Sequence, residues 1–210
     1  MNRLLPWRVG AWALGIIPLA FAIKWTFQSR LGPNPVEFLE HYTGDWTLRL
    51  LLTTLAMTPL RKLTRLTEPI RVRRTLGLWA YAFLCLHFSI YLMFDLGFSV
   101  VQLGEDLVKR TYITLGFTAW LMLLPLAITS TNAWQRRLKR RWLTLHQLIY
   151  PAAILGAIHY LWLVKADTRA PLIYLAILLA LLAFRLPMPT FLSRVTVFLV
   201  WIENYMGARP

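Results

Sequence analysis

Four histidines carry most of the chemistry that this sequence could perform. His87, His146 and His159 lie inside long apolar stretches, whereas His41 lies in a more polar one. An ionisable ring inside an apolar membrane span is costly and usually marks a functional site. Neutral imidazole is a common metal ligand and an axial ligand of haem iron. Our starting hypothesis is therefore that rings in the apolar stretches bind iron.

Few other reactive side chains lie inside the apolar stretches. Nearly all the acids lie outside the apolar stretches, whereas proton relays and ion paths usually use Asp or Glu within a span. The single cysteine, Cys85, allows no disulfide within the chain, and we interpret it as a small buried hydrophobe. Each histidine has an alternative as a hydrogen-bonding or headgroup residue. That alternative fits His146 best, and we interpret His41 as interfacial.

The composition is that of a membrane protein. The chain is 58% hydrophobic with a mean hydropathy of +0.53, which is too apolar for a soluble domain. Its ten tryptophans and eight tyrosines suit the aromatic belts at membrane interfaces. The net charge of +14 comes from short basic clusters between apolar stretches. The positive-inside rule explains such clusters, and no nucleic-acid-binding motif accompanies them, so we expect no nucleic-acid partner.

Six apolar stretches predict transmembrane helices, since a span needs about 20 residues. The second of them is short and ends at Pro59, and the segment 36–42 before it could form a separate interfacial helix. The first has no convincing cleavage site after it, so we predict a retained span rather than a signal peptide. The six stretches are 9–27, 46–60, 75–94, 112–128, 142–162 and 171–186.

A seventh apolar stretch, 190–205, is interrupted by Arg194 and Glu203. We predict an interfacial amphipathic helix there rather than a span. The predicted fold is therefore an all-α integral membrane protein, a six-helix transmembrane bundle with a C-terminal interfacial amphipathic helix. Its domains are 1–189, the bundle, and 190–210, the interfacial helix or tail.

The loops alternate in charge along the chain. The loops 61–74 and 129–141 are strongly basic, whereas 28–45 is acidic and 95–110 is mixed. Because cytoplasmic loops carry the excess of Lys and Arg, the basic loops define the cytoplasmic side. With six spans, both termini are then cytoplasmic.

Helical rise gives the depth of each ring and favours one pairing. His87 is about 12 residues into the stretch 75–94, and His159 is about 17 residues into 142–162. At ~1.5 Å per residue these rings lie ~18 and ~25 Å from the basic side, whereas His146 lies only ~6 Å deep. A haem held between two helices needs ligands at similar depth, so we predict that His87 pairs with His159.

The directions in which His146 and His159 point around the axis of the fifth stretch leave one alternative open. His146 and His159 are 13 residues apart, which is ~220° beyond about three full turns. In a straight helix the two rings would point to nearly opposite faces. Pro151 lies between them, and a proline kink can change this phase. The spacing alone does not decide whether both rings face the same helices.

Arg73 and Arg74 stand at the basic mouth of the third stretch. We interpret them first as basic residues that set the orientation of the protein in the membrane. Guanidinium groups also bind carboxylates in a bidentate fork, so the two could pair with haem propionates. The cluster 136–141 could similarly meet an anionic cofactor or a soluble electron donor.

Three strings resemble the MsrQ family, also called YedZ, of haem-binding membrane subunits of the periplasmic protein-methionine-sulfoxide reductase system. They are RRTLGLWAYAFLCLH, ending at His87, TSTNAWQRRLKRRWLTLHQLIY, containing His146, and IHYLW, containing His159. The strings HYTGDW and PLIYL fit as well. The resemblance extends from the first stretch to about Arg185.

The resemblance implies a ferric reductase-like transmembrane domain in a bacterial inner membrane, with one or two b-type haems and FMN. It implies an electron-transfer subunit fed by the quinol pool or a cytosolic flavin reductase. The acceptor is a separate periplasmic subunit with a molybdenum cofactor (molybdopterin), which reduces methionine sulfoxide in proteins. The family's ligand histidines match His87, His146 and His159.

One departure from the pattern of related oxidases leaves an inner haem without its second histidine ligand. Related oxidases carry two histidines on the third span, but here Arg73 lies 14 residues before His87. We therefore expect His87 and His159 to hold an outer haem, and His146 to serve an inner haem or another redox centre near the donor. The alternatives are a self-contained membrane ferric or quinone reductase, and a non-redox anchor or transporter.

Overall fold

All regular structure is helical in the part of the chain that the computed structural model describes, residues 3–164 and 167–185. The all-α prediction is confirmed, and the predicted C-terminal helix at 190–205 lies outside the described residues. The α-helices are α1 (Leu4–Phe27), α2 (Pro35–Thr64), α3 (Glu68–Ile90), α4 (Val100–Lys109), α5 (Thr111–Ile128), α6 (Asn132–Leu138), α7 (Arg140–Leu145), α8 (Ile149–Leu163) and α9 (Arg169–Ala183). A π-helical turn (Tyr91–Asp95) extends α3, and a 3-10 turn (His146–Leu148) joins α7 to α8.

Among the described residues, three helices are long and apolar enough to cross a membrane. They are α1, α3 with its π-helical extension, and α5, whereas α9 is apolar but shorter. Their length and composition confirm a membrane protein. The six-span count stays a prediction, because α2, α8 and α9 do not meet the same criteria.

The second predicted stretch is the middle of a much longer helix. Asn34 caps α2 by accepting a hydrogen bond from the Glu37 backbone N–H, and Pro35 occupies the first turn, where no N–H is needed. The segment 36–42 is thus the start of α2, and the prediction of a separate interfacial helix was wrong. The 95–110 loop also differs from expectation, because it contains α4.

Pro59 does not end α2, contrary to prediction. Proline has no N–H, so it leaves the carbonyl four residues earlier, at Leu55, without its helical donor. Arg185 supplies the missing donor, with its Nη2 at 2.6 Å from the Leu55 oxygen. The helix therefore continues through Pro59 to Thr64 and ends at Arg65, whose φ is 59°.

The fifth predicted stretch, 142–162, is broken rather than continuous. The 3-10 turn at His146–Leu148 separates α7 from α8. Pro151 then falls in the first turn of α8, a position where its missing N–H costs nothing. The proline therefore belongs to the start of a helix and does not kink its middle.

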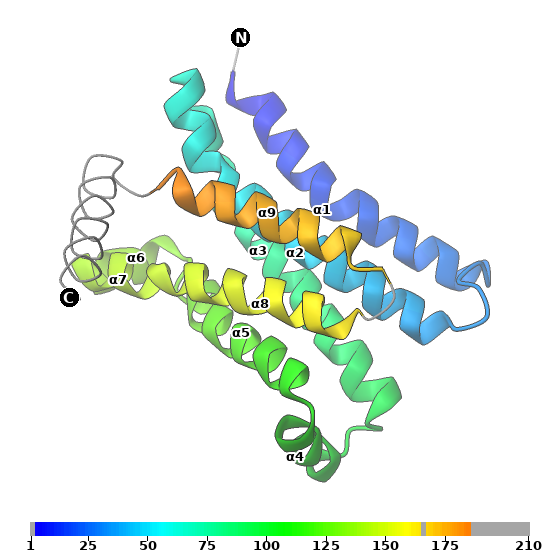
Figure 1. Cartoon of the computed structure of the whole chain (residues 1–210). Coiled ribbons are helices and arrows are strands. Elements are labelled where there is room, and N and C mark those ends of the chain that lie inside the picture. The colour runs from blue at the N-terminus through cyan, green and yellow to red at the C-terminus, as the bar shows by residue number, and fades with distance from the viewer. Residues whose placement is uncertain (1–2, 165–166, 186–210) are drawn as a thin grey trace, which may run out of the picture.

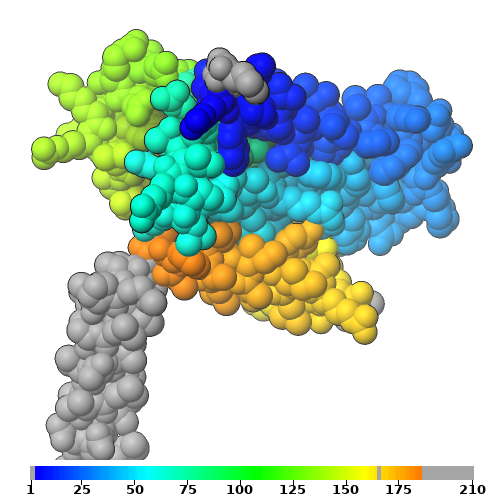
Figure 2. Space-filling model, turned by 90° about the horizontal axis from the view of Figure 1, so that it is seen from above, coloured from blue at the N-terminus to red at the C-terminus, as the bar shows by residue number. Residues whose placement is uncertain are grey.

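Helix α2 is the centre of the bundle and packs against α1, α3, α8 and α9. Figure 2 shows α2 between α1 on one side and α9 on the other. Its Leu50 and Leu55 are almost completely buried, as is Phe83 of α3. The alanines of α8 that face this core are fully buried too, and small side chains allow membrane helices to approach closely.

The two ends of the bundle differ in charge. In Figure 1 the α1–α2 connection and α4 lie toward one end, and the end of α2, α6, α7 and the end of α9 lie toward the other. We call the first the acidic end, because it carries Glu37, Glu40, Asp45, Asp95, Glu105 and Asp106. The second, the basic end, carries Arg61, Lys62, Arg71, Arg73, Arg74, Arg136, Arg137, Arg140 and Arg141.

Candidate functional site

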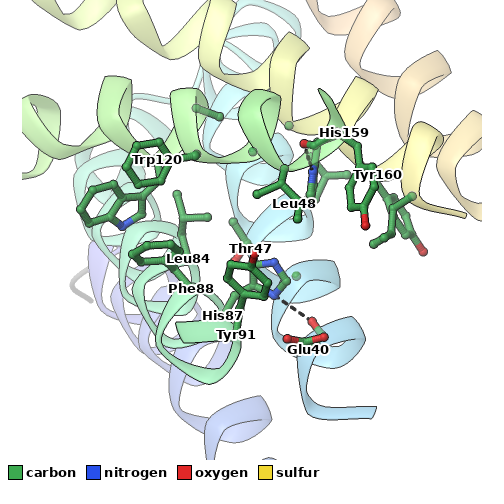
Figure 3. A pocket seen from close by; sticks show the side chains of 18 of the residues that line it. Glu40, Thr47, Leu48, Leu84, His87, Phe88, Tyr91, Trp120, His159 and Tyr160 are labelled. Atoms are coloured by element: carbon green, nitrogen blue, oxygen red, sulfur yellow. Dashed lines mark hydrogen bonds between the residues drawn. The ribbon is translucent and has the colours of Figure 1, made fainter. Parts of the chain in front are cut away.

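The structure brings His87 of α3 and His159 of α8 together. Their ring centroids are 6.4 Å apart, and the ring planes are inclined by 74°. Both rings line a cavity of about 310 Å³ between α2, α3, α5 and α8. Figure 3 shows the two imidazoles on different walls of this cavity.

Each of the two rings is held through its Nδ1 atom by a backbone carbonyl of another helix. His87 Nδ1 lies 3.0 Å from the Glu40 oxygen on α2, and His159 Nδ1 lies 2.6 Å from the Tyr112 oxygen on α5. A carbonyl only accepts, so each Nδ1 must donate a proton. In a neutral imidazole the other nitrogen, Nε2, then carries the free lone pair. This is the tautomer that a metal-ligating histidine adopts.

A glycine follows each of these carbonyls by one helical turn. Gly44 comes four residues after Glu40, and a Cβ there would lie 3.3 Å from Cε1 of His87. Gly116 comes four residues after Tyr112, and a Cβ there would lie 2.9 Å from Nδ1 of His159. A side chain at Gly116 would force the His159 ring to move, and one at Gly44 would crowd the His87 ring.

Sequence reasoning missed both glycines, although a signal existed. Glycine inside a helix costs about 1 kcal/mol relative to alanine, so its presence there indicates a packing or functional reason. The sequence could not say which ring would approach Gly44 and which Gly116. That pairing depends on how α2, α3, α5 and α8 pack.

The interior of the cavity is apolar. Phe88 and Phe117 lie against Trp120, with ring centroids 5.0 and 5.7 Å from the tryptophan. Leu48 and Leu84 add to the same walls. Aromatic and aliphatic walls around a few polar groups are typical of a cofactor pocket.

The mouth of the cavity is polar and lies at the acidic end. It is lined by Glu37, Glu40, His41, Asp45, Asp95 and Arg110. Glu40 precedes the apolar part of α2, and its burial, followed by the charges of Asp95 and Glu37, raises the pKa of this carboxyl to about 7. His41 is 45% exposed, with Nε2 at 4.0 Å from Glu37.

The donor set fits a metal that already carries other ligands. No cluster of three or more His, Cys, Asp or Glu side chains that could hold a bare ion exists in the described residues. Two facing imidazoles with free Nε2 atoms supply just two ligands. An iron whose remaining positions are filled by a porphyrin needs just such an axial pair, and the apolar walls suit the macrocycle.

His146 lies apart from this pair. It stands at the start of the 3-10 turn, and its ring stacks on Trp142 with centroids 3.8 Å apart. Its Nδ1 lies 3.1 Å from the Trp142 oxygen. It does not line the cavity, and the structure brings no other histidine to it.

The two predicted propionate partners also lie away from the cavity. Arg74 is exposed and donates to the Asn132 side chain at 2.9 Å, and Arg73 is half-buried at the basic end. Of the described cationic side chains, Arg110 is the one that lines the cavity, where it is paired with Asp106 at 3.3 Å. Cys85 is a free thiol and only partly buried.

Comparison with known proteins defines the class of the protein first. Residues 43–157 match the family described as ferric reductase like transmembrane component. This range includes Gly44, His87, Gly116 and His146 and stops two residues before His159. The chain thus has a ferric reductase-like transmembrane domain.

Comparison with individual relatives narrows the family further. A Xanthomonas campestris pv. campestris protein is 56% identical over 155 residues, which are 74% of this chain and 71% of that protein. A Xanthomonas axonopodis pv. citri protein is 49% identical over 180 residues, 82% of each chain. A Herminiimonas arsenicoxydans protein is 46% identical over 173 residues, 81% of this chain and 79% of that one. Each is named protein-methionine-sulfoxide reductase heme-binding subunit MsrQ, and this chain belongs to the MsrQ family.

Proposed function

We propose that this chain is a haem-binding electron-transfer subunit in which His87 and His159 are the axial ligands of one b-type haem. The observation that carries the proposal is the facing pair of imidazoles, each with its Nδ1 directed to a backbone carbonyl. The names of the relatives, which are haem-binding subunits, support it.

The haem, when bound, supplies a one-electron carrier. The protein holds and tunes it through its axial ligands, hydrogen bonds and burial. The carbonyls of Glu40 and Tyr112 fix the tautomer and orientation of the two rings. The cluster of Phe88, Phe117 and Trp120 gives the interior of the cavity an apolar wall.

The orientation of the protein in the membrane follows from charge. By the positive-inside rule the basic end is cytoplasmic and the acidic end periplasmic, in a bacterial inner membrane with both termini in the cytoplasm. The histidine pair opens toward the acidic end, so its haem is the outer one, close to a periplasmic acceptor. We propose that this acceptor is the molybdopterin-dependent subunit that reduces methionine sulfoxide in proteins.

On the cytoplasmic side, the donor is the quinol pool or a cytosolic flavin reductase. His146 stands at the basic end, and we assign it to the donor side, as a ligand of an inner redox centre or as part of the path to the outer haem. Only one histidine is available there, so a second haem would need a different second ligand. FMN follows from the family resemblance and has no residues assigned to it.

A pyridine-haemochrome titration tests the proposal. Purified wild-type protein, expressed with adequate haem, is compared with His87→Ala, His159→Ala and the control His41→Ala. We expect the reduced-minus-oxidised spectrum of the haem to be lost in the first two variants and kept in the control. A colourless wild-type protein would end the proposal.

Electron transfer itself needs a second measurement. The reduced protein is mixed either with the purified periplasmic reductase subunit or with a ferric chelate. Rapid reoxidation by the reductase and slow reoxidation by the chelate supports a subunit role. The reverse result identifies a self-contained ferric reductase.

A further inference from the structure

A group of half-buried charges lies at the basic end, away from the histidine cavity. Arg73 of α3 and Arg185, just after α9, are both half-buried. They lie within electrostatic range of each other, and Tyr150 of α8 lies within range of Arg73. His146 lies within range of Arg73 too. The charge of Arg185 thus acts on Arg73 at this end of the bundle.

Arg185 is fixed in place by neutral partners. Its Nη1 donates to the Tyr150 hydroxyl at 2.6 Å, and its Nη2 donates to the Leu55 carbonyl at 2.6 Å. The guanidinium carbon also lies 5.1 Å from the centre of the Tyr150 ring. Its Nε is buried and has no hydrogen-bond partner in the described part of the chain. These contacts orient the positive charge without neutralising it.

Arg73 has no hydrogen-bond partner in the ranges 3–164 and 167–185. The titratable groups that act on it there are Arg185 and Tyr150, and no carboxylate is among them. Of the eight Asp and Glu residues in these ranges, Glu68 alone lies near the basic end, in the first turn of α3. The two guanidinium groups therefore have no protein counter-ion in this part of the molecule.

An uncompensated charge in a buried position is costly, and the cost falls when an anion is bound. Guanidinium groups bind phosphate in a planar, bidentate fork, and two of them can share the oxygens of one phosphate. We propose that Arg73 and Arg185 together bind a phosphate group at the basic end of the bundle. The phosphate belongs either to a phospholipid headgroup or to a soluble phosphate monoester.

The neighbouring arginines of α3 are more exposed than Arg73. Arg74 is one residue further along α3, but it is exposed and paired with Asn132. Arg71 is exposed on the same helix. A general attraction of basic residues to anionic headgroups would affect all of them alike, whereas a built site depends on Arg73.

The key variant is Arg73→Gln, because it removes no hydrogen bond seen among the described residues and should fold. Arg71→Gln is the matched control, with the same change of charge on the same helix. We expect Arg73→Gln to weaken phosphate binding about tenfold or more, and Arg71→Gln to leave it nearly unchanged. Arg73→Lys, which keeps the charge but loses the fork, should fall between them.

Two probes separate the sources of the phosphate. Flavin mononucleotide and riboflavin differ only by a phosphate, and their binding is followed by quenching of flavin fluorescence. Phosphatidylglycerol, added to delipidated protein, is followed by native mass spectrometry. Selective binding of the mononucleotide, lost in Arg73→Gln, identifies a soluble monoester, and retention of the lipid with the same dependence on Arg73 identifies a headgroup.

The proposal is overturned if neither probe distinguishes wild type from Arg73→Gln, or if Arg71→Gln weakens binding as much. Haem content is measured in every sample. His87→Ala should lose haem and keep phosphate binding, because the two sites lie at different ends. A failure of the haem proposal is therefore distinguishable from a failure of this one.

Discussion

Gly116 lies directly against the imidazole of His159, so close that a Cβ on Gly116 would stand 2.9 Å from the ring Nδ1. The same nitrogen reaches the carbonyl of Tyr112, one helical turn earlier on α5. Glu40 and Gly44 of α2 repeat this arrangement for His87. Each ring is thus fixed by a helix other than its own, through a carbonyl and the glycine that follows it.

Replacing Gly116 with alanine should displace the His159 ring. A Cβ below 3.0 Å forces a shift, and such overpacking costs about 1–3 kcal/mol, or roughly tenfold in haem retention. Haem-to-protein ratio and the low-temperature EPR spectrum of the oxidised protein measure it. Gly10→Ala on α1 is the control, since nothing lies within 4 Å of a Cβ there. Equal haem retention in both variants would contradict the arrangement.

Gly44→Ala should act on His87 in the same way but more weakly. The nearest ring atoms would be 3.3 and 3.4 Å from the new Cβ, so the ring has to move by only a few tenths of an ångström. We expect retained haem, a cost of about 0.5–1.5 kcal/mol and a shifted midpoint potential in a redox titration. A larger haem loss in Gly44→Ala than in Gly116→Ala would contradict the prediction that the contact at Gly116 is the tighter of the two.

Substitutions at Arg185 and Pro59 should have coupled effects on the free energy of unfolding. Arg185→Leu leaves the Leu55 carbonyl without a donor, which costs about 1–3 kcal/mol. Pro59→Ala restores a backbone N–H at that turn of α2, so in this background the loss from Arg185→Leu should be smaller by about 1 kcal/mol. Urea unfolding of the four proteins in detergent, followed by circular dichroism, gives the coupling free energy. Strict additivity would mean that Arg185 does not compensate for the proline.

His146→Ala should leave the outer haem intact. The ring stacks on Trp142 and lies outside the cavity that His87 and His159 line. We expect the absorbance of that haem to be unchanged, and its reduction by a cytosolic donor to be slowed. Stopped-flow reduction, with His41→Ala as the matched control, measures this. Loss of the outer haem in His146→Ala would show that the three histidines form one site.

Sequence patterns were sufficient to predict the membrane class, the helical fold and a short list of candidate iron ligands. These follow from local properties, because apolar length, charge clusters and residue type are read along one segment at a time. The depth argument that places His87 and His159 at similar depth also uses a local property, the constant helical rise, and the structure brings the two ring centroids to 6.4 Å. The absolute depth of His87 did depend on where α3 begins, and that helix starts seven residues before the predicted stretch.

Tertiary packing sets which groups hold these rings and where the helices continue or break. The residues that accept from His87 and His159 are each 47 positions away in the chain. The donor that carries α2 past Pro59 is 130 positions away. Local patterns contain no information about such partners, because helix packing brings them together. For the same reason the sequence does not show that α2 continues past Pro59, or that Gly44 and Gly116 lie against the rings.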